Sequence, residues 1–192
     1  MRYTGGVSRG SRHYSLDDYF AVEQISEVRH EYWDGGIFAM AGASLPHNEI
    51  AANVLSELRA RLRESDCGAF GSDLRVCTPA GLYTYPDVSV VCGRVQLVPD
   101  RSDTATNPFV IAEVLSEATE EYDRGDKFAL YRSIPSLRHY ILISQTGVRV
   151  DHFHRIDPDE WPCRSMRAPD DRVEIRELGV SFALADAYRR VF

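Results

Sequence analysis

Residues 85–92 (YPDVSVVC) and 109–115 (FVIAEVL) decide the fold. Both segments are short, apolar and rich in β-branched side chains, which predicts two buried strands. Pro86 lies at the entrance of the first strand, where its missing N–H leaves the ladder of hydrogen bonds intact. Each segment also carries one acidic residue, Asp87 in the first and Glu113 in the second.

Glu113 occupies an unusual position for a charged residue. The two-residue period of a strand puts it on the same face as Ile111 and Leu115. A carboxylate on an apolar face is costly unless it is protonated, paired or bound to a cation. Glu113 is therefore a candidate for a functional site.

A third charged group lies in the helix that is predicted over residues 122–134 from its helical spacing of apolar positions. This group is Lys127, the single lysine in a chain with 21 arginines. Two interpretations are open. Lys127 pairs with Asp123 one turn earlier on a solvated helix face, or it is kept because chemistry requires a compact ammonium whose pKa shifts readily.

Two carboxylates and a lysine are the groups needed to hydrolyse a phosphodiester bond with a metal ion. Mg²⁺, or Mn²⁺ in its place, binds one or two carboxylate oxygens and keeps several waters. The ion polarises the phosphate and activates water, while the ammonium orients that water or neutralises developing charge. Asp87, Glu113 and Lys127 are thus the predicted catalytic residues, and Asp87 and Glu113 the predicted metal ligands.

The order of these segments resembles the Uma family of restriction-endonuclease-like proteins, a branch of the PD-(D/E)XK nuclease superfamily. The resemblance covers roughly residue 14 to the C-terminus. It rests on residues 30–35 (HEYWDG), 46–48 (PHN), 85–89 (YPDVS), 112–116 (AEVLS), 123–127 (DRGDK) and 137–140 (LRHY).

The resemblance implies the same metal-binding pair and assigns Lys127 as the catalytic base or charge stabiliser. In the superfamily pattern the lysine stands two residues after the acid, where this chain has Leu115. The resemblance implies that the role moves to Lys127 on the following helix. The family also tends to have Ser-Pro-Ser-Thr after the glutamate strand. This chain has residues 116–119 (SEAT) there, and Glu117 adds a negative charge where DNA would approach.

Glu31 and His47 are possible supporting residues. His47 lies in a predicted first helical turn, where the helix dipole favours an anion. Two interpretations are open: His47 contacts a phosphate or a metal-bound water there, or it caps the helix and has no chemical role. Glu31 is either a third metal ligand or part of an ordinary salt bridge. Asp73 is a weaker supporting candidate. His152 and His154 share a strand face without an evident third ligand, so we interpret them as exposed edge histidines.

The pattern as a whole predicts an α/β (α+β) fold. It comprises a restriction-endonuclease-like αβββαβ core with a mixed central sheet, an N-terminal helix and hairpin, and C-terminal strands. The crossover from the Glu113 strand to a strand over 137–144 should be right-handed and make these strands parallel. We interpret residues 1–13 as a disordered arm or an expression remnant, and 14–192 as one restriction-endonuclease-like domain. The other expected elements are helices from Ser15, over 44–64 and over 184–191, a hairpin over 31–40 that turns at 34–36, and strands over 69–77, 148–154 and 173–175.

Composition limits the possible partners. The net charge of −7 argues against a protein that coats nucleic acid, since such binding depends on neutralising phosphates, but it leaves room for a local basic surface. No apolar run approaches the roughly 20 residues that span a bilayer, so no membrane partner is expected. The four cysteines lack zinc-site spacing, and as free thiols they fit a reducing cytoplasm.

These observations predict a cytoplasmic, Mg²⁺-dependent endodeoxyribonuclease whose substrate is DNA. Cutting both strands of a duplex would favour a homodimer. The alternative is a catalytically silent module for dimerisation or nucleic-acid binding on the same fold, because a fold does not establish an activity.

Overall fold

The computed structural model describes residues 13–40 and 42–192. The helices are α1 (Leu16–Ile25), α2 (Leu45–Arg61), α3 (Glu120–Arg124), α4 (Asp126–Tyr131) and α5 (Leu184–Ala187), with a 3-10 turn η1 (Arg176–Leu178). The strands are β1 (His30–Trp33), β2 (Gly36–Ala39), β3 (Cys67–Gly71), β4 (Arg75–Cys77), β5 (Tyr83–Thr84), β6 (Val88–Cys92), β7 (Thr104–Ala105), β8 (Val110–Leu115), β9 (His139–Ser144), β10 (Val150–His154), β11 (Cys163–Met166), β12 (Arg172–Ile175) and β13 (Val180–Ala183).

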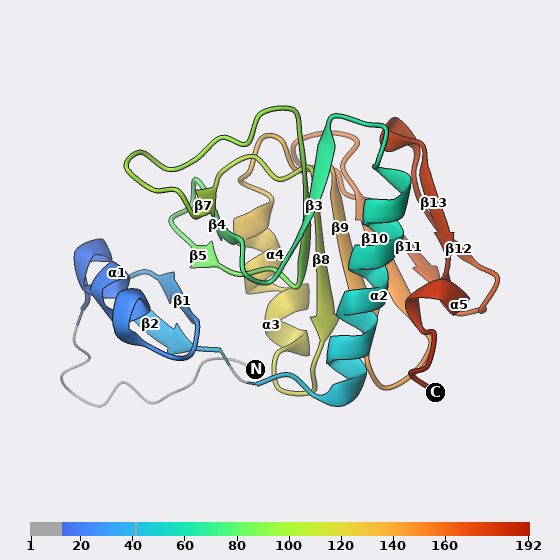
Figure 1. Ribbon diagram of the computed structural model, residues 1–192, viewed down its shortest axis with the longest axis horizontal. Coiled ribbons are helices and arrows are strands. Elements are labelled where there is room, and N and C mark those ends of the chain that lie inside the picture. The colour runs from blue at the N-terminus through green and yellow to red at the C-terminus, as the bar shows by residue number, and fades with distance from the viewer. Residues whose placement is uncertain (1–12, 41) are drawn as a thin grey trace.

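The centre of the molecule is a six-stranded mixed sheet with the order β11-β10-β9-β8-β6-β3. β8 and β9 are parallel, as the predicted crossover requires, and the other neighbours are antiparallel. Helix α2 covers one face of this sheet, and α3 and α4 lie against the other (Figure 1). The order α2, β3, β6, β8, α3–α4, β9 is the αβββαβ core, so the predicted fold class is confirmed.

Strand β8 is buried on both faces because its side chains alternate between two apolar clusters. Val110, Ala112 and Val114 pack on the side of α2. Ile111 and Leu115 pack on the side of α4. Glu113 lies between these last two along the strand and is itself buried, so the two-residue period placed this carboxylate on the correct face.

A second sheet, with the order β2-β1-β5-β4-β7, packs with α1 beside the core (Figure 1). The predicted β1–β2 hairpin turns at Asp34 and Gly35, whose φ angles are 47° and 76°. Positive φ at both central residues is the requirement of a two-residue hairpin turn, and Asp-Gly meets it. Ser15 caps α1 through the predicted capping box with Asp18.

Two predicted elements are divided in the structure. The expected strand over 69–77 is two strands, β3 and β4, which belong to different sheets. The chain turns between them, and Asp73 in this turn has a side chain that is 93% exposed and pairs with Arg29. The expected helix over 122–134 is broken at Gly125 into α3 and α4. A Cβ atom at position 125 would lie 3.1 Å from the Glu121 carbonyl oxygen, which is a tight contact, so glycine fits this position well.

The C-terminal region contains more strands than the sequence indicated. Within 155–171, β11 adds an edge strand to the central sheet. The expected last strand, β12, pairs with β13 as a separate two-stranded sheet, and the closing helix α5 ends at Ala187. Asn53 of α2 donates to the carbonyl oxygens of Ala187 and Arg189, so this end of the chain is tied to the core.

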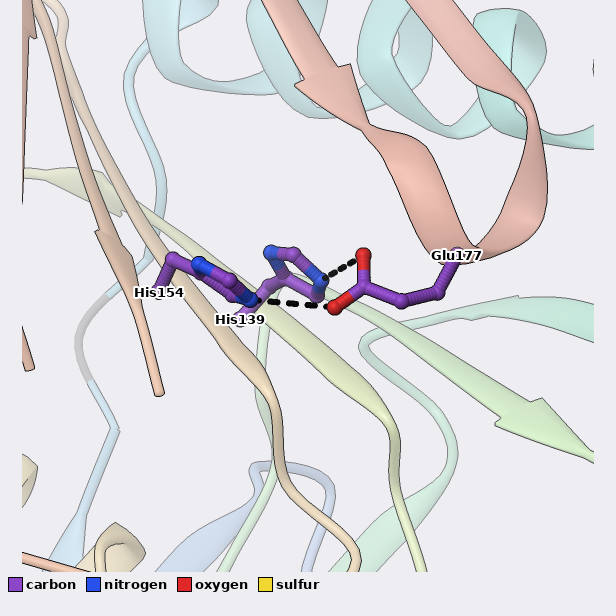
Figure 2. Close-up of side chains that lie close together, drawn as sticks. All are labelled: His139, His154 and Glu177. Carbon is purple, nitrogen blue, oxygen red and sulfur yellow. Dashed lines mark hydrogen bonds and ion pairs between the residues drawn. The ribbon is translucent and has the colours of Figure 1, made fainter. Parts of the chain in front are cut away.

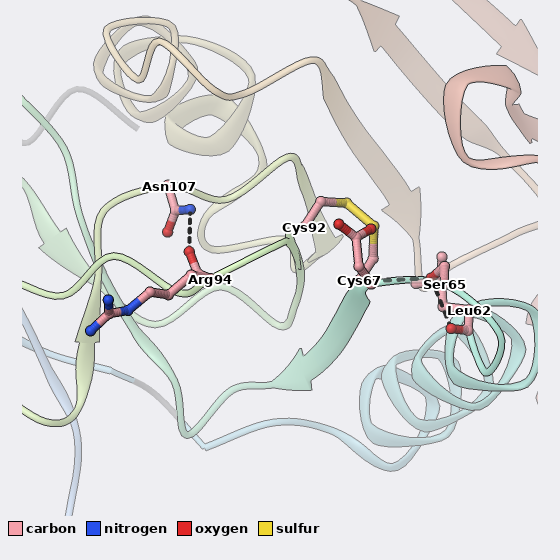
Figure 3. The surroundings of a disulfide bond; sticks show 7 residues. Leu62, Ser65, Cys67, Cys92, Arg94 and Asn107 are labelled. Carbon is pink, nitrogen blue, oxygen red and sulfur yellow. Dashed lines mark hydrogen bonds between the residues drawn. A yellow bond between two sulfur atoms is a disulfide. The ribbon is translucent and has the colours of Figure 1, made fainter.

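Cys67 of β3 and Cys92 of β6 form a disulfide bond (Figure 3). The prediction of free thiols is therefore wrong for these two cysteines, and only Cys77 and Cys163 have free thiols. The antiparallel register pairs Cys67 directly with Cys92, although they are 25 positions apart. Cysteine spacing alone does not reveal such a pairing.

No helix in the described ranges 13–40 and 42–192 is long and apolar enough to cross a membrane. The interpretation of residues 1–13 as an arm falls, apart from His13, outside the described residues.

Candidate active site

Asp87 and Glu113 face each other across two antiparallel strands. Val88 pairs with Ala112 in the register of β6 and β8, which puts the preceding Asp87 opposite Glu113. The Asp87 backbone N–H donates to Glu113 Oε2 at 3.3 Å. In return, Asp87 Oδ2 accepts from the Val114 N–H at 2.8 Å. The sheet register therefore holds the two carboxylates side by side.

Lys127 brings its ammonium to the same place from α4. The Lys127 Nζ lies 2.9 Å from Glu31 Oε1, 3.0 Å from Glu113 Oε1 and 3.6 Å from Asp123 Oδ1. The residue is only 5% exposed. The i, i+4 pair with Asp123 exists, but it is buried, so the solvated helix face of the first interpretation is wrong.

Glu31 and His47 approach the pair from opposite sides. Glu31, on β1, lies on the lysine side, where its Oε1 also accepts from Thr84 Oγ1 at 2.5 Å. His47 lies in the first turn of α2, behind the N-cap Ser44, and its Nε2 is 3.2 Å from Asp87 Oδ2. Within the described part of the chain, the buried His47 Nδ1 has no hydrogen-bond partner.

Burial and mutual charge shift the pKa values of these groups. Burial raises the pKa of Glu113 to about 8, and the charge of Asp87 adds to this effect while Lys127 opposes it. Burial by itself lowers the pKa of Lys127. The nearby negative charges, chiefly those of Glu113 and Glu31, outweigh this effect of burial, so the pKa lies well above its usual value. Burial likewise lowers the pKa of His47, but its hydrogen bond to Asp87 and the negative charges of the nearby carboxylates together more than offset this, so the net shift is upward.

The donor set fits a hard divalent cation. The carboxylates of Glu31, Glu113 and Asp123 contact a single ammonium, and a fourth carboxylate, that of Asp87, lies beside Glu113. Burial is the main cause of the raised pKa of Glu113, and the negative charges of Asp87 and Asp123 add to it. The hydrogen bonds that described residues make to the Asp87 side chain end on Oδ2, which leaves Oδ1 for a ligand. Carboxylate oxygens are the ligands that Mg²⁺ and Mn²⁺ prefer.

Two residues of the site were missing from the sequence-based prediction of its members. Tyr131 O–H donates to Glu113 Oε1 at 2.8 Å. Tyr131 stands four residues after Lys127, on the same side of α4. This i, i+4 spacing could have indicated that Tyr131 lies close to Lys127. Asp123 was considered only as a surface partner for Lys127, and its burial depends on tertiary packing. By contrast, the exposed Asp73 pairs with Arg29 in the turn before β4, so its assignment as a supporting residue was wrong.

The sequence is similar to a family model and to two Synechocystis proteins. A family model described as "Uma2: Putative restriction endonuclease" matches residues 16–185. The Synechocystis protein slr1290, described as uncharacterised, is 39% identical over 178 residues, which is 91% of this chain and 91% of that protein. A second Synechocystis protein described as uncharacterised, sll1609, is 31% identical over 158 residues, 82% of this chain and 89% of that protein.

One solved structure resembles the whole fold. It comes from Anabaena variabilis and is described as "a putative nuclease belonging to DUF820". Its TM-score is 0.76 at 17% sequence identity, and the match covers 93% of this chain and 99% of that chain. At this identity the likeness shows the fold alone, and it confirms the prediction of a restriction-endonuclease-like fold.

Proposed function

Because the chain belongs to the Uma2 family, which is described as "Putative restriction endonuclease", we propose that it is a metal-dependent endodeoxyribonuclease. Family membership and the shared fold support a nuclease. The proposal adds the substrate, DNA, the metal, Mg²⁺ with Mn²⁺ as a substitute, and the residues that do the chemistry. The observation that supports it best is the buried ammonium of Lys127 between Glu31 and Glu113, beside Asp87.

In the proposed mechanism Asp87 and Glu113 would hold a metal ion, which would supply polarisation of the scissile phosphate and a lowered pKa of the attacking water. The Lys127 ammonium lies between the Glu31 and Glu113 carboxylates. Its proposed role is to orient the attacking water and to stabilise negative charge on the phosphate oxygens. Tyr131 and Glu31 fix the position of this ammonium and of Glu113.

His47 is proposed to position Asp87. Its Nε2 contacts Asp87 Oδ2, and this contact orients the carboxylate as outer hydrogen bonds orient metal ligands elsewhere. The buried Nδ1 lacks a partner among the described residues, and a water or a phosphate oxygen of the substrate would satisfy it.

Two further parts of the proposal concern the assembly and the compartment. A homodimer would supply one site for each strand of a duplex, which accounts for double-strand cleavage by a chain with one such site. A DNA substrate favours a cytoplasmic location. The Cys67–Cys92 disulfide argues in the other direction, because disulfide bonds are rare in reducing compartments such as the cytoplasm.

We expect the protein to cut DNA only with Mg²⁺ or Mn²⁺, and the Asp87→Asn variant to cut at least about 10² times more slowly. Loss of a metal ligand removes several kcal/mol of transition-state stabilisation. The measurement is the cleavage rate on supercoiled plasmid, linear duplex and single-stranded DNA. Asp73→Asn is the matched control, because it removes the same charge at a position whose side chain is 93% exposed.

The alternative of a silent binding module predicts a different result. The protein would then shift DNA in a gel without cutting any of the three substrates, with or without metal. Equal cleavage by Asp87→Asn and Asp73→Asn would place the nuclease chemistry elsewhere in the molecule.

Mg²⁺ alone should stabilise the protein through the same carboxylates. A cation that binds the native state raises the free energy of unfolding by about 2.7 kcal/mol at 100 times its Kd. The midpoint of thermal unfolding should therefore rise with Mg²⁺ concentration in the wild type and in Asp73→Asn, but much less in Asp87→Asn. An identical rise in all three proteins would show that Asp87 does not hold the cation.

A further inference from the structure

A second group of convergent side chains lies on the opposite face of the central sheet from the candidate active site. His139 of β9, His154 of β10 and Glu177 of η1 direct their polar atoms toward one point (Figure 2). One ligand atom from each residue lies within 4.8 Å of the other two. His152, the neighbour of His154 on the same strand face, contacts His139 at its Nδ1 atom, the ring nitrogen that does not face Glu177.

The geometry is that of a chelating site. His139 Nε2 lies 3.1 Å from Glu177 Oε2, and His154 Nε2 lies 3.0 Å from Glu177 Oε1. The His139 and His154 rings are stacked, with centroids 4.8 Å apart and planes 13° apart, so both Nε2 atoms face the same carboxylate (Figure 2). Ligands at the bond lengths of a tetrahedral zinc site stand roughly 3.3 Å from one another, close to the two separations observed here.

The contact between His139 and His152 leaves two tautomers of His139 open. His139 Nδ1 is 2.9 Å from His152 Nε2, and both atoms belong to buried residues. If His139 donates from Nε2 to Glu177, it accepts from His152 at Nδ1, and this is the arrangement without a cation. If it donates from Nδ1 to His152, its Nε2 lone pair is free to bind a cation, and the other N–H of a metal-bound histidine is typically held by a hydrogen bond.

This cluster is separate from the candidate active site. Glu113 pairs with Leu142, and His139 pairs with Val110, so the two sites are three residues, roughly 10 Å, apart along β9. They also lie on opposite faces of the sheet. His139 shares its face with Ile141 and Ile143 on the α2 side, whereas Glu113 points to the side of α4.

A cavity of about 490 Å³ opens above the cluster, and its lining includes Arg164 and Arg176 as well as the three histidines. His139 is buried, whereas the side chains of His154 and Glu177 are 44% and 41% exposed. An ion can therefore enter from solvent, and the coordination position that faces the cavity is open to water or an anion.

We propose that His139, His154 and Glu177 bind a transition-metal dication of the Zn²⁺ type, with His152 orienting His139. Two imidazole nitrogens and one carboxylate suit Zn²⁺ or Co²⁺, whereas Mg²⁺ prefers oxygen ligands. The ion would link the β12–β13 sheet, through η1, to the central sheet. This site does not depend on the proposed nuclease function.

The test uses Zn²⁺ and Co²⁺ alone with the full chain in the Asp87→Asn background, where the other carboxylate site is weakened. We expect saturable binding of one ion, a rise in the thermal midpoint with Zn²⁺ and the visible absorption of four-coordinate Co²⁺. His154→Ala and Glu177→Gln should each weaken Zn²⁺ binding at least about tenfold, as even substitution of residues that only support a metal ligand does. Both residues are partly exposed, so these variants should fold.

The matched control is Glu174→Gln. Glu174 lines the same cavity and carries the same charge as Glu177, but it is not one of the three convergent residues. We expect it to bind Zn²⁺ like the parent protein. Unchanged affinity in His154→Ala, or an equal loss in Glu174→Gln and Glu177→Gln, would overturn the proposal, since binding would then reflect general charge.

Discussion

The Glu113→Gln variant should lose DNA cleavage by at least about 10²-fold while gaining stability at alkaline pH. The carboxamide cannot replace the negative oxygen that the proposed metal ion requires, and several kcal/mol of transition-state stabilisation are lost with it. The fold should tolerate the change, because Gln has nearly the same shape and Lys127 keeps its contacts with Glu31 and Asp123.

The gain in stability follows from the pKa of Glu113. Burial raises this pKa from 4.5 to about 8 in the folded state, so between these values the folded protein binds more protons than the unfolded chain. Stability therefore falls as pH rises through this window. Gln has no proton to lose, and the variant should show a flatter profile, with an advantage on the order of a few kcal/mol near pH 8.

Urea unfolding at several pH values from 5 to 9, without metal, measures this profile beside the cleavage rate. Glu117→Gln is the control, since Glu117 is an exposed carboxylate just after the same strand. A parallel loss of stability with pH in the wild type and in Glu113→Gln would contradict the assignment of the raised pKa. Full cleavage by Glu113→Gln would remove Glu113 from the proposed metal site.

The largest effect on stability is expected from Lys127→Met. Methionine fits the space of the lysine stem but leaves Glu31, Glu113 and Asp123 without their shared ammonium. Removing one partner of a buried ion pair costs about 3–5 kcal/mol. The pKa of Lys127 is raised in the folded state, so its stabilisation is complete at neutral pH and is lost only as pH rises through that high value.

The loss should shrink in acid, because burial raises the pKa of the Asp123 carboxyl, so this partner of Lys127 becomes protonated as pH falls. Chemical denaturation at pH 7 and at pH 4.5 measures both values. Arg132→Met removes a cation whose partner, Asp159, is fully exposed, and such surface pairs contribute about 0–1 kcal/mol. Equal destabilisation by the two substitutions would mean that the buried carboxylates do not depend on Lys127.

Local patterns predicted the parts of the fold and site that depend on local rules. Strand period placed Glu113 on the face of Ile111 and Leu115, and the crossover rule predicted parallel β8 and β9. The Asp34-Gly35 turn has positive φ at both positions, as its hairpin requires. These features depend on neighbours in the sequence or on chain handedness.

The features that the sequence did not predict depend on contacts between distant segments of the chain. The apolar spacing of 69–77 gave no sign that the chain passes from one sheet to another between β3 and β4. The histidines of β10 were interpreted as exposed edge residues, but β11 covers that edge and His152 is buried. Glu177 comes from η1, the turn between the strands of a separate sheet, so no sequence spacing connects it to His139 and His154. The break between α3 and α4 could have been predicted from Gly125, because glycine inside a helix costs about 1 kcal/mol relative to alanine.

The candidate active site has a consequence for the kinetics of folding, because its members come from five distant segments of the chain. Thr84 and Glu31, for example, are 53 positions apart when they meet beside the ammonium. Contacts of long sequence separation form slowly, since loop closure must precede them. An intermediate that lacks β1 would therefore lack Glu31, one of the carboxylates that hold the Lys127 ammonium. The candidate site would reach its native geometry only after β1 has docked beside the central sheet.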